Sequence, residues 1–455
     1  MGLRSINPAT GQLIESYNEY FSSEIDLVLN TSMETFMHWQ FSESETRIHL
    51  LKNLAHQLRL NQQALATLIT LEMGKPITES LGEIEKCALT CEYYAEHAIH
   101  LLSPELIKTQ ASKSYAIGKA MGPLLAIMPW NFPFWQVFRF AGPAITGGNT
   151  VVLKHASNVC GCALAIQKLF SDAGYPKGAF QCLLIPNVRV EQLIADKRIK
   201  AITLTGSTPV GRIVAQQAGK HLKKIVLELG GSDPYIILED ADLIQAVEAC
   251  VTGRLVNAGQ SCIGAKRFIV LEGIYNRFEE FFTEKMKTTL WGDPMDKLTQ
   301  MGPMARMNLR DDLHAQAMKS VDKGAKLLTG GYIPQGEGYY YPPTVLSNVS
   351  HGMPAWNEEL FGPVASLIKV KTIAEAIKVA NGTTFGLGAA VFTKDIEKGQ
   401  FIAENLLEAG SCFVNDYVRS DPRLPFGGIK ESGYGRELSH YGIKEFMNIK
   451  TVWIK

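Results

Sequence analysis

The sequence predicts an α/β protein with two parallel sheets, and three observations support this fold class. Short apolar runs alternate with amphipathic stretches along most of the 455 residues. One run, residues 201–204 (AITL), leads into the glycine turn GSTPVG at 206–211 and then into a helical pattern. Strand, glycine turn and helix in this order are typical of a dinucleotide-binding sheet. After residue 228 the alternation starts again, which indicates a second α/β unit.

The first half of the chain contains both kinds of element. Apolar residues at helical spacing predict helices at 24–40, at 43–72, near 76–102, up to about 172 and up to about 221. Continuous apolar runs predict buried strands at 122–128, 150–154 and 201–204. We therefore expect a first Rossmann-like sheet that ends near residue 228.

The second half repeats the pattern up to about residue 428. Its expected elements are a strand at 234–238 (PYIIL), a helix from about 242, a strand at 266–271 (KRFIVL) and a helix near 274–289. Residues 108–121 are polar and poorly periodic. The run IKTVWI at 449–454 reads as an exposed strand without an obvious local partner. Such a terminal strand usually finds its partner elsewhere, often in another subunit.

Composition excludes several classes of protein. The 45 basic and 45 acidic side chains balance, so charge gives no reason to expect nucleic acid or an anionic membrane as a partner. No apolar run approaches the roughly 18 residues of a membrane span, and we expect a cytoplasmic protein. The eight cysteines lack the spacing of a zinc site, so we expect no metal. Seven of them read as buried small hydrophobes.

Three short segments carry residues with chemical potential. Cys262 ends the run GQSC, Glu228 lies in LELGG, and Asn131 lies in PWNFP. A thiolate can attack a carbonyl carbon, and a carboxylate can later activate the water that releases it. An amide fixed between two prolines is a suitable oxyanion donor. The three residues together therefore suggest covalent chemistry on a carbonyl group.

In this order and spacing the three segments resemble the aldehyde dehydrogenase superfamily, and within it most closely the succinate-semialdehyde dehydrogenases. The resemblance spans nearly the whole chain, from the NPATG run near the N-terminus to the terminal strand. It implies that Cys262 is the nucleophile and that Asn131 and the backbone N–H of Cys262 receive the oxyanion. It also implies that Glu228 is the base for deacylation. A hydride then passes from the substrate carbon to a nicotinamide cofactor.

The resemblance further implies a division into domains and an oligomerisation arm, and with it a homodimer or homotetramer. The implied division is a dinucleotide-binding domain at 1–107 and 122–228, a catalytic domain at 229–428, and an arm at 108–121 and 429–455.

The phosphate side of the cofactor site has no GxGxxG motif. The turn that opens a helix at 206–211 can instead hold a pyrophosphate, and Gly206, Ser207 and Gly211 match the family's motif. Lys154 matches the lysine that bonds the adenosine ribose. Ser157 stands where relatives that depend strictly on NAD carry a glutamate, and a serine leaves room for a 2′-phosphate. We therefore predict NADP as the preferred cofactor, with NAD as the alternative.

Three more residues complete the cofactor site that the resemblance implies. Glu359 would bond the nicotinamide ribose, Phe361 would pack near the ring, and Trp130 belongs to the same group.

The substrate is expected to be a short aldehyde that carries a distal carboxylate. Arg139 follows Asn131 by eight residues, where succinate-semialdehyde dehydrogenases carry an arginine, and its guanidinium would bind that carboxylate. A salt bridge at the surface or between domains is the alternative role for Arg139. The expected substrate-binding residues are Trp135, Arg139, Ser261, Ser420 and Phe426.

The expected reaction is the oxidation of succinate semialdehyde to succinate, the last step of 4-aminobutyrate breakdown. Glutarate semialdehyde or an unfunctionalised aldehyde is the alternative substrate.

A coenzyme-A-acylating enzyme is disfavoured because thiolysis needs no base at Glu228. A catalytically inactive binding or structural homologue is disfavoured by the intact motifs. A thiol protease is disfavoured because no histidine falls within them.

Overall fold

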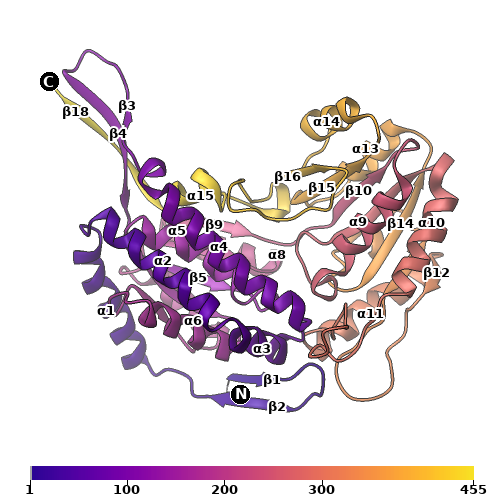
Figure 1. The fold of residues 1–455 in the computed structure, drawn as a ribbon, viewed down its shortest axis with the longest axis horizontal. Coiled ribbons are helices and arrows are strands. Elements are labelled where there is room, and N and C mark those ends of the chain that lie inside the picture. The colour runs from indigo at the N-terminus through magenta and orange to yellow at the C-terminus, as the bar shows by residue number, and fades with distance from the viewer. Residues whose placement is uncertain (1–2) are drawn as a thin grey trace.

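The computed structural model describes residues 3–455, which form two large sheets, a three-stranded arm and an N-terminal hairpin (Figure 1). The hairpin pairs β1 (Leu3–Ile6) with β2 (Leu13–Tyr17). The two large sheets, each with helices against both faces, confirm the predicted α/β class. Within residues 3–455, no helix combines the length and the apolar character that crossing a membrane requires.

The first sheet has six strands in the order β17-β9-β8-β5-β6-β7. Its parallel strands are β5 (Pro123–Met128), β6 (Thr150–His155), β7 (Phe180–Cys182), β8 (Ala201–Thr205) and β9 (Lys224–Glu228). The chain runs outward from β5 through β6 to β7, then returns to β8 on the other side of β5. Such a reversal of strand order is where parallel sheets bind ligands, beyond the carboxyl ends of the strands.

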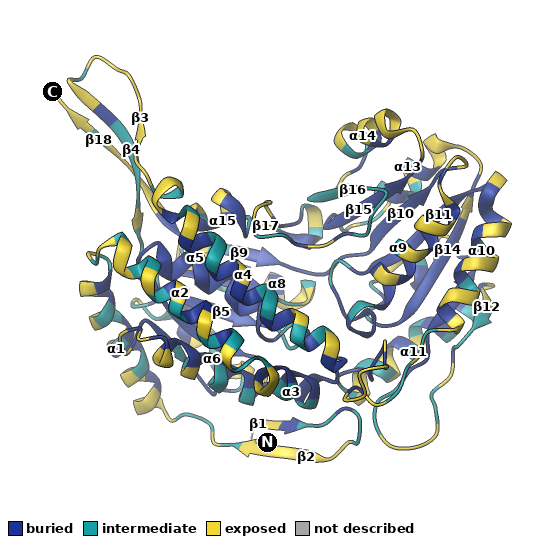
Figure 2. Cartoon of the chain, in the orientation of Figure 1, coloured by how far each residue is buried: buried dark blue, intermediate teal, exposed yellow. Residues whose placement is uncertain are grey.

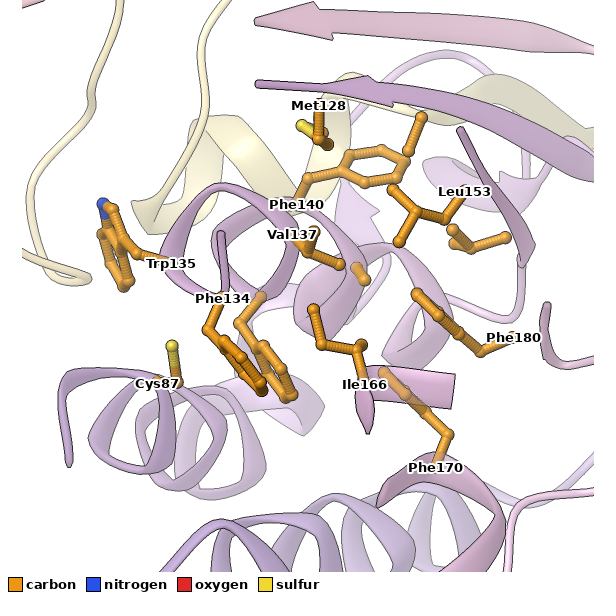
Figure 3. Close-up of a cluster of buried hydrophobic side chains, with 14 of the residues drawn as sticks. Cys87, Met128, Phe134, Trp135, Val137, Phe140, Leu153, Ile166, Phe170 and Phe180 are labelled. Carbon is orange, nitrogen blue, oxygen red and sulfur yellow. The ribbon is translucent and has the colours of Figure 1, made fainter. Parts of the chain in front are cut away.

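Alternating side chains of the first sheet build two cores. Leu124 and Ala126 of β5 face a core shared with helices of one layer, and Leu125 and Ile127 face the other. Figure 3 shows part of the first core, with Phe134, Val137 and Phe140 packed near Ile166 and Phe170. The helices of that layer are α2 (Ser44–Leu60), α3 (Gln62–Met73), α4 (Ile77–Leu101), α5 (Trp135–Thr146) and α6 (Cys160–Asp172). The opposite layer contains α1 (Ser22–Trp39), α7 (Val190–Ala195) and α8 (Thr208–Lys220).

The second sheet has seven strands in the order β12-β13-β14-β11-β10-β15-β16, all parallel except β12. The strands are β10 (Asp233–Ile237), β11 (Ala265–Leu271), β12 (Lys326–Thr329), β13 (Thr344–Ser347), β14 (Val364–Val370), β15 (Gly388–Phe392) and β16 (Ser411–Val414). One core is shared with α9 (Leu243–Leu255) and α10 (Glu272–Lys287). The other is shared with α11 (Met307–Asp322), α12 (Pro354–Asn357), α13 (Ile373–Asn381) and α14 (Ile396–Asn405).

The arm projects from the body and is largely exposed (Figures 1 and 2). It contains β3 (Glu105–Leu106), β4 (Lys113–Ala120) and β18 (Met447–Ile454). The terminal strand β18 pairs antiparallel with β4 over its whole length, from Met447 opposite Ala120 to Ile454 opposite Lys113. The partner of the terminal strand is therefore far from it in the sequence, in a segment whose polar composition hides its strand character.

The C-terminal segment from residue 429 does not belong to the arm alone. Its first strand, β17 (Gly433–Tyr434), pairs with β9 in the first sheet, and α15 (Ser439–Glu445) packs near α5. The three-stranded sheet therefore takes only Met447–Ile454 from this segment.

Two smaller predictions also differ from the structure. The single helix expected at 43–72 is two helices, because Asn61 leaves the helical conformation at φ −104° and its side-chain amide donates to the carbonyl of Gln57 at 2.8 Å. All eight cysteines are free thiols, but Cys412 in β16 is half-buried rather than buried.

Candidate active site

A cavity of about 340 Å³ lies beyond the carboxyl ends of β5, β8 and β9, where the chain passes from the first sheet to the second. This is the edge at which a reversal of strand order favours ligand binding. Its wall takes residues from the first sheet's loops and from loops and α11 (Met307–Asp322) of the second unit. The sequence-predicted residues among them are Trp130, Asn131, Gly206, Ser207, Cys262, Glu359 and Phe361.

The loop that carries Cys262 has a strained backbone held by hydrogen bonds. Asn257 and Ala258 have φ values of 56° and 52°, in the left-handed region that non-glycine residues rarely adopt. The side-chain amide of Asn257 donates to the carbonyl of Asn131 at 2.7 Å, and its backbone N–H donates to the Glu79 carboxylate at 2.9 Å. These bonds hold the loop in its strained shape beside Asn131.

A buried lysine fixes the nucleophile from the other side. The Nζ of Lys266 donates to the carbonyls of Ser261 at 2.9 Å and Cys262 at 2.7 Å. It also lies 3.4 Å from the carboxylate of Glu359. Ser261 is buried within this loop. Lys266 therefore connects the cysteine loop to Glu359, which the sequence assigns to the cofactor site.

Asn131 is mounted on a second anchored segment. Its amide Nδ2 donates to the carbonyl of Gln260 at 3.0 Å, so it lies against the loop of the cysteine. Just beyond it, the first turn of α5 donates the N–H groups of Phe134 (2.9 Å) and Trp135 (3.0 Å) to Glu83. The buried Glu83 is itself paired with Lys75. The ion pair between Glu83 of α4 and Lys75, just before that helix, thus anchors the start of α5 beside Asn131.

The thiol of Cys262 is half-buried, and its protonation follows from its surroundings. Burial raises the pKa of Cys262 to about 11, although Arg139 and Lys266 act in the opposite direction. Since the thiolate is the nucleophilic form, the thiol must lose its proton before it attacks.

Glu228 ends β9 and is fully buried. Burial, and then the neighbouring carboxylate of Glu437, raise the pKa of Glu228 well above its ordinary value, while Arg139 and Arg436 oppose the shift. Neither carboxylate oxygen of Glu228 has a hydrogen-bond partner within residues 3–455. A buried carboxyl group with a raised pKa suits a general base that works near neutral pH.

The guanidinium of Arg139 is not an unpaired cation. It is 2% exposed, forms an ion pair with the buried Glu437, and donates to the Thr205 hydroxyl at 3.2 Å. Every residue of α5 is buried, so a charge on this helix requires an internal counterion. The alternative interpretation of Arg139, a salt-bridge residue, describes its position better, although the salt bridge is buried rather than exposed.

The remaining expected substrate residues lie around α5. Trp135 begins the helix at the edge of the core cluster (Figure 3). The ring of Phe426 lies 4.8 Å below the Arg139 guanidinium. The hydroxyl of Ser420 accepts a hydrogen bond from Lys86 at 2.8 Å.

The phosphate side of the cavity is the N-terminus of α8. Ser207 is the residue before the helix, and Gly206 and Ser207 both line the cavity. The N–H groups and the dipole at such a terminus attract anions. Gly211 has a packing role, because a side chain there would collide with Leu229, 2.5 Å away.

Trp130, Phe361 and Glu359 surround the opposite part of the cavity. The rings of Trp130 and Phe361 meet edge to face with centroids 5.9 Å apart. Glu359 accepts the N–H of Gly231 at 3.0 Å, and a side chain at Gly230 would collide with its carboxylate. The glycines of LELGG thus leave room for Glu359.

Lys154 and Ser157 lie at the end of β6 and beyond it, outside the cavity wall formed by the described residues. The buried Nζ of Lys154 donates to Asn187 at 2.5 Å, and burial lowers the pKa of Lys154 to about 8. Ser157 is exposed.

Sequence reasoning missed several charged residues at the site. Glu437 pairs with Arg139 across 298 positions of sequence, and Lys86 meets Ser420 across 334. Arg306 lines the cavity, with its guanidinium 5.9 Å from the Trp130 ring. For Lys86 one signal was available, because this charged residue lies among apolar positions of α4 that are buried. No comparable signal existed for Glu437 and Arg306.

No group of three or more His, Cys, Asp or Glu side chains suited to a metal ion occurs in the part of the chain that the structure describes. The site is instead a thiol, an amide and a helix N-terminus around one cavity, between two parallel sheets. This arrangement defines a class of two-sheet α/β proteins with a cysteine in the cavity beyond the carboxyl ends of the first sheet.

The sequence profile of the Aldehyde dehydrogenase family matches residues 2–452, and the chain belongs to this family. A probable succinate-semialdehyde dehydrogenase [NADP(+)] of Synechocystis sp. is 46% identical, with 100% of each chain covered. The succinate semialdehyde dehydrogenase [NAD(P)+] of Escherichia coli is 46% identical over 99% of this chain and 97% of its own. The succinic semialdehyde dehydrogenase of Streptococcus pyogenes, solved with NADP+, has a TM-score of 0.97 at 38% identity, with 99% of each chain covered. These findings confirm the resemblance seen in the sequence.

Proposed function

We propose that the protein oxidises succinate semialdehyde to succinate with NADP as the hydride acceptor. The observation that carries this proposal is the meeting of Cys262 and Asn131 in one cavity with the N-terminus of α8. The names of the Synechocystis and Escherichia coli relatives support the substrate.

In this proposal Cys262 and Asn131 act first. The Cys262 thiol gives its proton to water, the thiolate attacks the aldehyde carbon, a C–S bond forms, and the carbonyl electron pair moves to oxygen. The Asn131 amide, which donates to the Gln260 carbonyl in the structure, turns its N–H toward this oxygen together with the backbone N–H of Cys262. Bound NADP would supply the acceptor for the hydride that leaves the same carbon.

Glu228 acts in the second half of the proposed reaction. Its carboxylate takes a proton from a water molecule, and the hydroxide attacks the thioester carbon. The C–S bond then breaks and releases succinate and the Cys262 thiolate. The raised pKa of Glu228 supports this role, because the base must both accept and release a proton near neutral pH.

The preference for NADP rests on the end of β6. Ser157 presents a hydroxyl instead of a carboxylate, and Lys154 lies three residues before it. A cation and a hydroxyl suit a 2′-phosphate, whereas a carboxylate would repel it. NAD remains the alternative cofactor, and the name of the Escherichia coli relative includes both.

The test is a comparison of kcat/KM for succinate semialdehyde, glutarate semialdehyde and butanal, each with NADP and with NAD. We expect succinate semialdehyde with NADP to have the highest value. A higher value for butanal would overturn the proposed substrate, and a strong NAD preference would overturn the proposed cofactor. A requirement for coenzyme A would assign the protein to acylating enzymes instead.

We also propose that the arm joins copies of the chain into a homodimer or homotetramer. Its strands expose Leu106, Ile449 and Trp453, large apolar residues for which a partner surface is expected. Light scattering coupled to size exclusion tests this proposal, and a monomer would overturn it.

A further inference from the structure

A left-handed turn of three residues precedes the loop of Cys262. Asn257, Ala258 and Gly259 have φ values of 56°, 52° and 73°. Consecutive left-handed residues are costly where they carry a side chain, so such a turn persists only where surrounding contacts hold it. The position of Cys262, three residues after the turn, therefore depends on the groups that bond this turn.

The side chain of Asn257 joins the two segments that carry the reacting groups. Its amide donates to the carbonyl of Asn131 at 2.7 Å and to the carbonyl of Gln260 at 3.2 Å. The amide of Asn131 donates to the same Gln260 carbonyl at 3.0 Å. A displacement of Asn257 would therefore shift the oxyanion segment and the cysteine loop relative to each other.

Glu79 holds the backbone of this turn from α4, a helix that packs on the first sheet. Its carboxylate accepts the N–H of Asn257 at 2.9 Å. The turn is also bonded by Arg254, which donates to the carbonyl of Gly259 at 2.6 Å. Burial lowers the pKa of Arg254 only to about 10, so this contact keeps its charge at neutral pH. The contact from Glu79 is the one that can change its charge near neutral pH.

A second cavity, of about 530 Å³, gives access to Glu79. Its wall includes Glu248 and Thr252 of α9 and Lys285 of α10. Among the residues that the structure describes, it shares no lining residue with the cavity that holds Cys262. Glu79 is half-buried in this wall, so it can exchange protons with water without passage through the site of Cys262.

The charged groups around Glu79 leave it close to neutrality. Burial raises the pKa of Glu79 to about 7, Lys75 and the N–H of Asn257 oppose the shift, and Glu83 adds to it. Lys75 is itself paired with Glu83.

The other charges of the second cavity balance each other, since Lys285 lies 3.5 Å from the carboxylate of Glu248. The N–H of Asn257 stabilises the ionised form of Glu79. By the reciprocity of linked equilibria, ionised Glu79 must stabilise the bonded form of the turn.

We propose that Glu79 is a positioning residue, whose ionised carboxylate fixes the turn at 257–259 and with it the relative placement of Asn131 and Cys262. Protonation of Glu79 weakens its bond to Asn257 and loosens the turn. The inference rests on the proposed function for its kinetic consequence. Glu79 is ionised above about pH 7, so the turn should be held more firmly at pH 8 than at pH 6.

Hydrogen exchange tests the hold on the turn without any substrate. Mass spectrometry of the peptide that contains Asn257, corrected for the intrinsic pH dependence of exchange, measures its protection in the wild-type protein. We expect this protection to fall at least about threefold from pH 8 to pH 6, because about nine tenths of Glu79 is protonated one unit below its pKa. In Glu79→Gln the protection should be the same at both pH values.

The kinetic test follows the first turnover of cofactor reduction with succinate semialdehyde in rapid mixing. Glu79→Leu removes the acceptor, and we expect the first turnover to slow about 10- to 100-fold, the scale of a small misplacement of reacting groups. KM for the aldehyde should change less than about threefold, because Glu79 does not touch the substrate. Glu79→Gln keeps a neutral acceptor and should recover part of the rate. Glu248→Gln, in the wall of the same cavity, is the matched control and should change nothing.

The pH profile separates positioning by a charge from a merely structural role. The ratio of the wild-type rate to the Glu79→Gln rate cancels the titrations that both proteins share, such as those of Cys262 and Glu228. This ratio should rise between pH 6 and pH 8 as Glu79 ionises. A constant ratio would overturn the inference, and so would a Glu79→Leu protein with a wild-type first turnover.

The remaining outcomes are also decisive. If the wild-type protein oxidises no aldehyde, the proposed function fails, and hydrogen exchange still decides whether Glu79 holds the turn. Equal losses in Glu79→Leu and Glu248→Gln would show a general effect of the cavity wall and would overturn the role of Glu79. If Glu79→Leu does not fold, protection of the wild-type turn that stays constant from pH 6 to pH 8 would refute the proposal.

Discussion

The loop that carries Cys262 and the surroundings of Lys86 are built in opposite ways. In the loop, Asn257, Lys266 and Asn131 bond the backbone at several points, and the geometry is set before any substrate arrives. At Lys86 the ammonium group meets a hydroxyl and a ring but no carboxylate within residues 3–455. The interactions of the loop are complete and fix its geometry, whereas the ammonium group of Lys86 lacks a carboxylate partner in the described residues.

The largest expected effect comes from removing the nucleophile. Cys262→Ala should reduce kcat for aldehyde oxidation by at least about 10⁴-fold, because no other thiol can form the covalent intermediate. The backbone bonds from Lys266 do not involve the sulfur, so the variant should fold normally. Steady-state turnover and circular dichroism are the two measurements. Undiminished turnover in a folded variant would remove the basis of the mechanism.

A smaller but more specific effect is expected for the base. Glu228→Gln should slow deacylation by about 10²- to 10⁴-fold and leave acylation largely intact. Rapid mixing should then show a burst of reduced cofactor, followed by slow turnover. In the wild-type protein the raised pKa predicts that deacylation accelerates as pH rises through that pKa, because only the carboxylate accepts a proton. A burst-free variant with an unchanged pH profile contradicts the assignment.

Next in size is an effect on stability rather than on rate. Arg139→Met leaves the buried Glu437 without its counterion, and breaking such a pair typically costs about 3–5 kcal/mol. Denaturant unfolding should show this loss, and Arg139→Met with Glu437→Leu should recover much of it. If Arg139→Met is as stable as the wild-type protein and only raises KM for succinate semialdehyde, Arg139 binds the substrate carboxylate as the sequence suggested.

The smallest effect sharpens the description of the thiol itself. With the pKa of Cys262 raised to about 11 by burial, alkylation by iodoacetamide should be slow at neutral pH in the cofactor-free protein. The labelling rate should increase about tenfold per pH unit and continue to rise above pH 9. Mass spectrometry of the labelled peptide measures it. A rate that levels off near pH 8 would show a thiolate already stabilised by Arg139 and Lys266.

The sequence predicted the features that depend on contiguous residues. The strand runs of both sheets and the motifs around Asn131 and Cys262 could be recognised because apolar periodicity and local spacing determine them. The break at Asn61 was missed because the apolar pattern continues across it. The strand character of β4, the partner of β18, was missed because this polar, partly exposed strand carries little hydrophobic signal.

The charges of the site show the same limit more strongly. Arg139 could be recognised by its distance from Asn131, but its ion pair with Glu437 joins positions 298 residues apart. The contact between Lys86 and Ser420 joins positions even farther apart. Such pairings arise only when α4, α5 and the C-terminal segment pack together. A cation such as Arg139, which has no counterion near it in the sequence, can therefore be paired with a distant carboxylate in the fold.

The return of β17 to the first sheet makes the polypeptide pass twice between the two large units. Gly433 lies opposite Glu228, so the strand that presents the carboxylate is flanked by β8 on one edge and β17 on the other. Any rotation of one unit against the other must bend both crossings at once, and both adjoin Glu228. We therefore expect a deletion that removes residues 433–455 to disturb the setting of this carboxylate as well as the arm.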